Sequence, residues 1–211
     1  MALRCRTRHT RPMNLRRFLV PHFEIRWIPS LLGISLLGAL AAGLYGILHD
    51  QVTYSISPEY FTNVKYLQFD YLNPDLPDRV RVAQIGFLAT WGMGFIGAWF
   101  MARLSVPRHP FRQALRLCLF GFAIMFAATL AAGMIGWTLG EWHGPDYGRW
   151  EPFIHQFGVE DLPAFVQVAY IHNAGYMGAF TGLLAALVLI WRRRDGVSPR
   201  LRGASSPTAR C

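Results

Sequence analysis

Four apolar runs, each long enough to cross a bilayer, constrain this chain more than any other feature. They cover residues 28–48, 82–104, 114–140 and 165–191, and charged residues occur only near their ends. A membrane-spanning helix needs about 20 apolar residues to cross about 30 Å of hydrocarbon. With 53% hydrophobic and only 16% charged residues, the chain is too apolar for an ordinary soluble enzyme. The sequence therefore predicts an all-α integral membrane protein, a four-helix up-down bundle.

Small residues spaced four apart mark one face of each predicted span. They are Gly38, Ala42 and Gly46; Thr90, Gly94 and Ala98; Ala128, Ala132, Gly136 and Gly140; and Gly178 and Gly182. Because lipid supplies no hydrophobic force between helices, close backbone approach at small residues is what holds such helices together. The stripes favour one compact bundle in which the first and fourth helices are neighbours. A dimer would use the same surfaces, so the oligomeric state stays open.

Arginine placement predicts the orientation of this domain, residues 28–191. Seventeen of the 21 Lys and Arg residues lie in the basic segments 1–27 and 192–211 or in the stretch from Arg103 to Arg116, where the second span ends and the third begins. By the positive-inside rule, both termini are expected in the cytoplasm and the two longer loops on the other side. The cations gather at the ends of spans rather than along one amphipathic face, so nucleic acid is not an expected partner.

The first apolar run also permits a processing alternative. The segment 39–41 has the small-x-small form of a signal cleavage site, but apolar sequence continues past it to Leu48, which favours a retained span. Met13 offers a second start, in which case residues 1–12 are not native; otherwise they are expected to be disordered. The cysteines are Cys5, Cys118 and Cys211. They form no CxxC pair, so neither a disulfide framework nor a thiolate metal site is expected.

The first outer loop is predicted to contain a short amphipathic helix. Ser57 has the features of an N-cap, Pro58 of the first helical residue and Glu59 of an early-turn acid. Apolar positions then recur with helical spacing at Tyr60, Val64, Leu67 and Tyr71. Such a face suits the membrane surface or the top of the bundle.

A layer of polar residues is expected at the outer membrane boundary, because a count of about 20 residues from each cytoplasmic arginine ends at polar residues. The candidate cluster is His49, Asp50, Glu59, Glu141, His143, His172, Asn173 and Tyr176. Imidazoles and carboxylates are ligands for zinc, copper or iron, so His49, His143 and His172 are candidate metal ligands. Haem b between His49 and His172 is an alternative. The competing interpretation is a hydrogen-bond network that caps the bundle, with Tyr176 holding the His172 ring. No catalytic residue and no obligatory cofactor are predicted.

Trp91 stands at mid-depth in the second span, between Thr90 and Gly92. Core packing against the neighbouring glycines is the simpler interpretation, and an apolar pocket for a lipid or quinone is the alternative. No Lys, Arg, Asp or Glu lies deep inside a span, which argues against an ion-coupled transporter.

Three segments carry a resemblance to a protein family. They are HDQVTYSISPEYFT at 49–62, ATWG at 89–92 and HNAGY at 172–176. Together they resemble a group of small bacterial four-helix integral membrane proteins with no known activity. The resemblance implies the bacterial inner (cytoplasmic) membrane and brings no cofactor or catalytic residue. Within this motif, HDQ is expected to end the first helix and Pro58 to begin the surface helix.

Three functions stay open at this point. The first is a non-enzymatic accessory or complex-forming membrane subunit, whose partners are the lipid bilayer and a membrane protein or a second copy of the chain. The second is a metal- or haem-binding membrane redox protein that uses histidines at the outer boundary. The third is a small-molecule transporter that acts as a dimer. The lack of a nucleophile beside a base and of a phosphate-binding loop favours the first.

Overall fold

Four long helices dominate the computed structural model, which describes residues 24–142 and 150–193. They are α2 (Ile28–Ile56), α4 (Asp78–Ser105), α5 (Phe111–Trp142) and α7 (Leu162–Arg193). All four are long and apolar enough to cross a membrane, and no strand occurs among the described residues. The predicted all-α bundle is confirmed, and this architecture is that of a multi-pass membrane protein.

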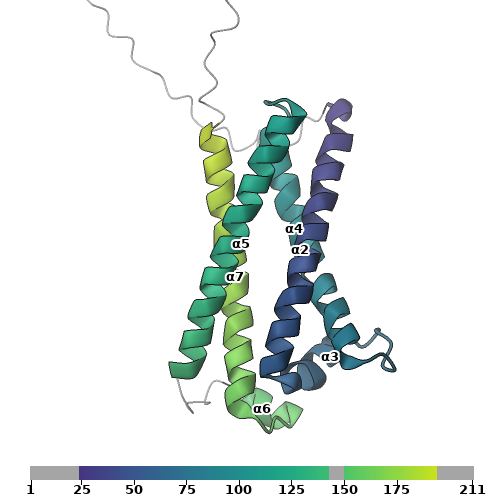
Figure 1. Cartoon of the computed structure of the whole chain (residues 1–211), viewed down its shortest axis with the longest axis vertical. Coiled ribbons are helices and arrows are strands. Elements are labelled where there is room, and N and C mark those ends of the chain that lie inside the picture. Colours follow the sequence, from purple (N-terminus) through teal and green to yellow (C-terminus); the bar gives the residue numbers. More distant parts are fainter. Residues whose placement is uncertain (1–23, 143–149, 194–211) are drawn as a thin grey trace, which may run out of the picture.

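The helices run alternately up and down, so the chain's described ends lie together. Figure 1 shows the start of α2, the α4–α5 connection and the end of α7 at one end of the bundle. A 3-10 turn, η1 (Ile25–Trp27), precedes α2 at that end. The opposite end carries three short elements, which we call the cap: η2 (Tyr60–Lys65), α3 (Tyr66–Gln68) and α6 (Glu151–Phe157).

Small residues bring the helices together in two pairs, α2 with α4 and α5 with α7. A Cβ added at Gly178 would lie 2.6 Å from the Ala128 carbonyl oxygen, so only glycine permits this approach of α7 to α5. In the other pair the Thr90 hydroxyl donates a hydrogen bond across the interface to the Ala42 carbonyl, at 2.8 Å. The predicted stripes therefore do pack, because backbones in close contact replace the missing hydrophobic force. The expectation of first and fourth helices as close neighbours is only partly met, since α2 and α7 share far fewer contacts.

All four helices contribute to one apolar core near the end of the bundle where the chain's ends lie. Its buried members include Leu31 from α2, Met101 from α4, Cys118 from α5 and Ile190 from α7. The bundle is therefore held as one body at this end, while the cap covers the other.

The first helix is longer than the sequence predicted, and this is a correction. The HDQ motif does not end α2, which continues to Ile56. The hydroxyls of Thr53 and Ser55 donate to the carbonyls of His49 and Gln51, four residues earlier, at 3.1 and 3.0 Å. These polar side chains are satisfied by the helix itself, so the helix does not stop where the apolar run stops. His49 and Asp50 consequently lie inside α2.

The predicted N-cap residue of the loop helix is present, but the buried face of that helix differs from the prediction. The Tyr60 amide donates to the Ser57 hydroxyl at 3.3 Å, which is the geometry of an N-cap. The chain then forms the π-helix η2 instead of a regular α-helix. Its buried side chains are Phe61 and Lys65, whereas the predicted Leu67 and Tyr71 are exposed. Hydrogen bonds from i to i+5 widen each turn and so change which residues face inward.

Trp91 does not pack in the core. It is 43% exposed on the outer surface of α4. A Cβ added at the adjacent Gly92 would meet nothing within 4 Å, whereas Gly94 faces Gly38 of α2. Gly92 and Gly94 thus lie on different sides of α4. In this architecture the indole of Trp91 faces lipid.

Candidate metal centre

Three side chains that can ligate a metal meet between α2 and α7, just beneath the cap. His49 and Asp50 come from α2 and His172 from α7, and one ligand atom from each lies within 4.8 Å of the other two. Asp50 and His172 are only 5% and 3% exposed. The rings of His49 and His172 are in edge contact, with centroids 4.9 Å apart. Proximity of these two histidines was predicted from the depth of each along its span, and it is confirmed.

The hydrogen bonds of His172 define what its second nitrogen can do. Nδ1 lies 3.0 Å from the Val168 carbonyl oxygen, one turn earlier in α7. A carbonyl can only accept, so Nδ1 carries the proton of this bond. The Nε2 atom of a neutral His172 is then a bare lone pair, and it lies 3.3 Å from the Asp50 carboxylate oxygen Oδ1. Two acceptors face each other unless a proton or a cation lies between them.

Aromatic rings surround this pair. The His172 ring lies 4.8 Å from the Tyr60 ring and 6.1 Å from that of Phe61, centroid to centroid. On the α2 side, the His49 ring stacks on Tyr45 at 5.6 Å. An uncompensated carboxylate in such surroundings is costly, so the enclosure strengthens the demand for a proton or a cation at Asp50.

A buried amine lies on the cap side of the same region. Lys65, the only lysine of the chain, is 8% exposed. Its Nζ donates to Oε1 of Gln68 at 3.2 Å and lies 5.6 Å from the Tyr60 ring centroid. Burial lowers the pKa of the Lys65 amine, while the Asp50 carboxylate acts in the opposite direction. Burial also raises the pKa of the Tyr60 hydroxyl, which therefore stays a neutral phenol.

The separations suit a single small metal ion. Ligands about 2.0–2.1 Å from a tetrahedral zinc ion lie roughly 3.3 Å from one another. Nε2 of His172 and Oδ1 of Asp50 already have that spacing, at 3.3 Å. The remaining atom, from His49, needs an approach of about 1.5 Å at most, within reach of a small side-chain rotation. Two imidazoles and one carboxylate are also the donor set that holds Fe(II) in sites with open coordination positions.

Haem does not suit this geometry. A porphyrin between His49 and His172 needs a flat slot between the two imidazoles. Their rings touch edge to face, and Tyr60 and Phe61 pack against His172. A bare ion fits between these side chains, whereas a macrocycle would have to displace them.

Other predicted members of the cluster lie elsewhere. Glu59 accepts hydrogen bonds from the backbone amides of Glu160 and Asp161, the shortest at 2.9 Å, and so joins the two halves of the cap. Glu141 accepts from Trp137 at 2.8 Å and from Gln167 at 3.4 Å, and does not join the cluster.

Asn173, Tyr176 and His143 are the remaining predicted members of the cluster. Asn173 is exposed. The Tyr176 ring centroid is 6.3 Å from that of His172, and the Val168 carbonyl, rather than Tyr176, orients the imidazole. His143 lies outside the described residues. Helix phase explains why Asn173 is exposed although its neighbour His172 is buried, because equal depth in the membrane does not place residues on the same face of a helix.

Sequence reasoning missed two residues of the enclosure. Tyr45 forms part of the aromatic wall and Lys65 is the buried amine, whereas Phe61 belongs to the 49–62 motif that the sequence singled out. One signal was available for Lys65. It is the single lysine among the Lys and Arg residues of the chain, and it follows shortly after the 49–62 motif. For Tyr45, its position one turn before His49 was the available signal.

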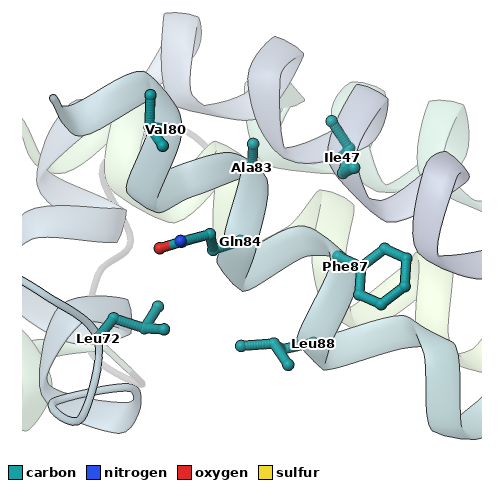
Figure 2. Close-up of a pocket in the computed structure, with 7 residues that line it drawn as sticks. All are labelled: Ile47, Leu72, Val80, Ala83, Gln84, Phe87 and Leu88. Carbon is teal, nitrogen blue, oxygen red and sulfur yellow. The ribbon is translucent and has the colours of Figure 1, made fainter. Parts of the chain in front are cut away.

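An apolar groove lies on another side of the bundle. Its volume is about 460 Å³, and Figure 2 shows its lining. The lining residues are Ile47, Leu72, Val80, Ala83, Gln84, Phe87 and Leu88. Trp91, for which the sequence suggested a pocket, is not among them. The lining residues come from α2, the first outer loop and α4.

Comparison with known proteins identifies no matching family model, no matching curated protein and no matching solved structure.

Proposed function

We propose that this chain is a multi-pass membrane protein that binds one divalent transition-metal ion between His49, Asp50 and His172. One observation carries the proposal: Nε2 of His172 lies 3.3 Å from the Asp50 carboxylate while Nδ1 lies 3.0 Å from the Val168 carbonyl, so this contact needs a proton or a cation between Nε2 and Oδ1. Histidines that ligate metals typically donate their second ring N–H to a carbonyl or carboxylate, which fixes the ring and its tautomer.

The surroundings support binding rather than a surface contact. Asp50 and His172 are buried, so bulk water does not solvate the carboxylate or the imidazole. His49 is only partly buried, so the third ligand lies on the side from which an ion can enter. Three protein ligands leave at least one coordination position free, which is the arrangement of reactive rather than purely structural metal sites. A metal-binding membrane redox protein was the second of the functions that the sequence left open.

Metal content of the purified protein tests the proposal. The protein is loaded in mild detergent with Zn²⁺, Mn²⁺, Co²⁺ or anaerobic Fe²⁺, desalted and analysed for bound metal. About one ion per chain is expected, with a Co²⁺ absorption spectrum characteristic of low coordination number. Asp50→Asn and His172→Ala are expected to lose the ion.

His155→Ala is the matched control. His155 is an exposed imidazole in the cap whose nearest acid, Glu151, lies 3.9 Å away, so its removal should leave metal content unchanged. No retained ion in the unmodified protein, or equal loss in the control, would contradict the proposal.

We also propose the bacterial inner membrane as the location, with both termini in the cytoplasm. The distribution of arginine supports the orientation, and the resemblance of the 49–62 motif supports the compartment. A non-enzymatic accessory role, alone or alongside metal binding, stays a prediction. Co-purification of a stoichiometric membrane partner would support it. The dimeric transporter likewise stays a prediction.

A further inference from the structure

The apolar groove beside α4 contains an unsatisfied polar atom. Oε1 of Gln84 is buried and has no hydrogen-bond partner among the described residues. Figure 2 shows the Gln84 side chain reaching out from α4 between Val80 and Leu72, with Leu88 on the far side of the groove. A buried acceptor without a partner costs free energy, and a ligand that brings a hydroxyl or amine donor would remove that cost.

A second unsatisfied atom lies one turn closer to the cap. Nε of Arg81 is buried and has no hydrogen-bond partner in the described chain, and the guanidinium lies over the Tyr66 ring at 3.7 Å from its centroid. Residues three apart share a face of a helix, so Arg81 and Gln84 lie along the same side of α4. The apolar groove thus offers an acceptor at Gln84, and Arg81, which is not part of the lining, adds a cation beside its cap end.

The charged neighbours of Arg81 in sequence already have hydrogen-bond partners of their own. The closest acid in sequence, Asp78, already accepts hydrogen bonds from the hydroxyls of Tyr54 and Tyr66, at 3.1 and 2.9 Å. Arg79 is held by the Gln51 carbonyl at 2.9 Å and the Ser55 hydroxyl at 3.1 Å. Arg81 is therefore the cation that can receive an anionic group.

The depth of these residues selects the ligand. Gln84 lies at the cap end of the apolar run 82–104, where hydrocarbon gives way to the headgroup region. A molecule that fits must be apolar along Phe87 and Leu88, carry a donor at Gln84 and be anionic at Arg81. A phospholipid with an anionic, hydroxyl-bearing headgroup meets these requirements, because its acyl chains end and its headgroup begins at the depth of Gln84.

We propose that this groove is a specific binding site for phosphatidylglycerol, with an acyl chain along Ile47, Phe87 and Leu88, a headgroup hydroxyl donating to Gln84 and the phosphate at Arg81. The site is independent of the metal centre. Its affinity derives from the contacts of the headgroup hydroxyl with Gln84 and of the phosphate with Arg81, which a zwitterionic lipid without hydroxyls cannot make together. Arginine binds phosphate oxygens with directed N–H donors.

Lipid titration of the delipidated full chain in detergent tests this site. The probes are short-chain phosphatidylglycerol, phosphatidylcholine and phosphatidylmethanol, an anionic phospholipid whose headgroup has no hydroxyl. Binding is followed by native mass spectrometry and by the shift in unfolding temperature. Phosphatidylglycerol is expected to bind about tenfold more tightly than phosphatidylcholine. Phosphatidylmethanol is expected to fall between the two.

Three variants separate the contacts. Arg81→Gln should abolish the preference for both anionic lipids, and Gln84→Leu should make phosphatidylglycerol and phosphatidylmethanol equivalent. Arg79→Gln, a neighbouring arginine with its own partners, is the control and should retain the preference even if it lowers stability. Because each readout is a ratio of affinities within one variant, a general loss of stability does not imitate the result. Equal affinity for all three lipids, or equal effects of Arg79→Gln and Arg81→Gln, would overturn the proposal and indicate bulk lipid contact only.

Discussion

Nε2 of His172 lies 3.3 Å from Oδ1 of Asp50, although 122 residues separate them in the chain. Because Nδ1 of the same ring is committed to the Val168 carbonyl, the contact needs either a shared proton or a metal ion. Replacing Asp50 tests whether a metal ion is bound there, and this is the basis of the first prediction.

Asp50→Asn should leave the metal-free protein as stable as the unmodified one or more so, because the Asn amide can donate to Nε2 without any shared proton. The same change should remove stabilisation by metal. At a free Zn²⁺ concentration about 100 times the dissociation constant, the unmodified protein should gain about 2.7 kcal/mol and the variant almost none. Unfolding in detergent with and without Zn²⁺ measures both quantities. Equal zinc stabilisation of the two proteins would rule out Asp50 as a ligand.

Lys65→Met should stabilise the protein near pH 7 by about 1 kcal/mol or more, because it removes a buried charge while keeping an apolar chain of similar length. Burial lowers the pKa of folded Lys65 from its ordinary value of 10.5. Between the lowered pKa and 10.5 the unfolded state holds more protons, so the stability of the unmodified protein should rise with pH in this window. The advantage of the variant should therefore shrink as pH approaches 10.5.

Lys65→Arg provides the comparison for this experiment, since arginine keeps its charge throughout the range. It should show neither the gain at neutral pH nor the convergence at high pH. A constant difference between Lys65→Met and the unmodified protein across the titration would mean that Lys65 does not change its protonation there.

Ser57→Ala should loosen the cap without preventing membrane insertion. The Ser57 hydroxyl accepts the hydrogen bond of the Tyr60 amide at 3.3 Å, and loss of an N-cap oxygen typically costs about 1 kcal/mol. Amide hydrogen exchange should become faster across residues 59–69 and stay unchanged in α5. Unchanged exchange in η2 would show that Ser57 does not stabilise that helix.

Gly178→Ala should destabilise the bundle by about 1–3 kcal/mol, because the new methyl group would lie 2.6 Å from the Ala128 carbonyl oxygen and 2.6 Å from the Ala132 Cβ. Gly33→Ala is the matched control, since a Cβ there meets nothing within 4 Å. That variant should be neutral or slightly stabilising because alanine favours helix over glycine. Similar losses in both variants would mean that α5 and α7 do not rely on this close approach.

Reporter fusions test the proposed orientation. A fluorescent protein fused after Arg194 should be fluorescent, and alkaline phosphatase inserted after Gly148 should be active, because seventeen of the 21 basic residues lie on the sides assigned to the cytoplasm. The reverse pattern of activity would invert the topology and place the proposed metal site beside the cytoplasm.

The sequence by itself determined the four helices, since only apolar runs of this length satisfy both the bilayer and the backbone. It also determined which helix faces pack, because glycine stripes such as that of Gly178 permit contacts that larger residues forbid. Counting residues inward from the arginines placed His49 and His172 at one depth. Periodicity along each helix was enough for these inferences.

Tertiary structure decided which residues of that polar layer meet. Glu141 and His172 are predicted at the same level, but Glu141 bonds to Trp137 and Gln167 because helix rotation, which depth does not specify, directs it there. The pairing of α2 with α4 arises from contacts between segments that are distant in the chain. The continuation of α2 to Ile56 and the π-helix that buries Lys65 are further features that the sequence pattern did not specify. Sequence patterns report the apolar faces of single helices; the enclosure around Asp50 depends on how those helices turn toward one another.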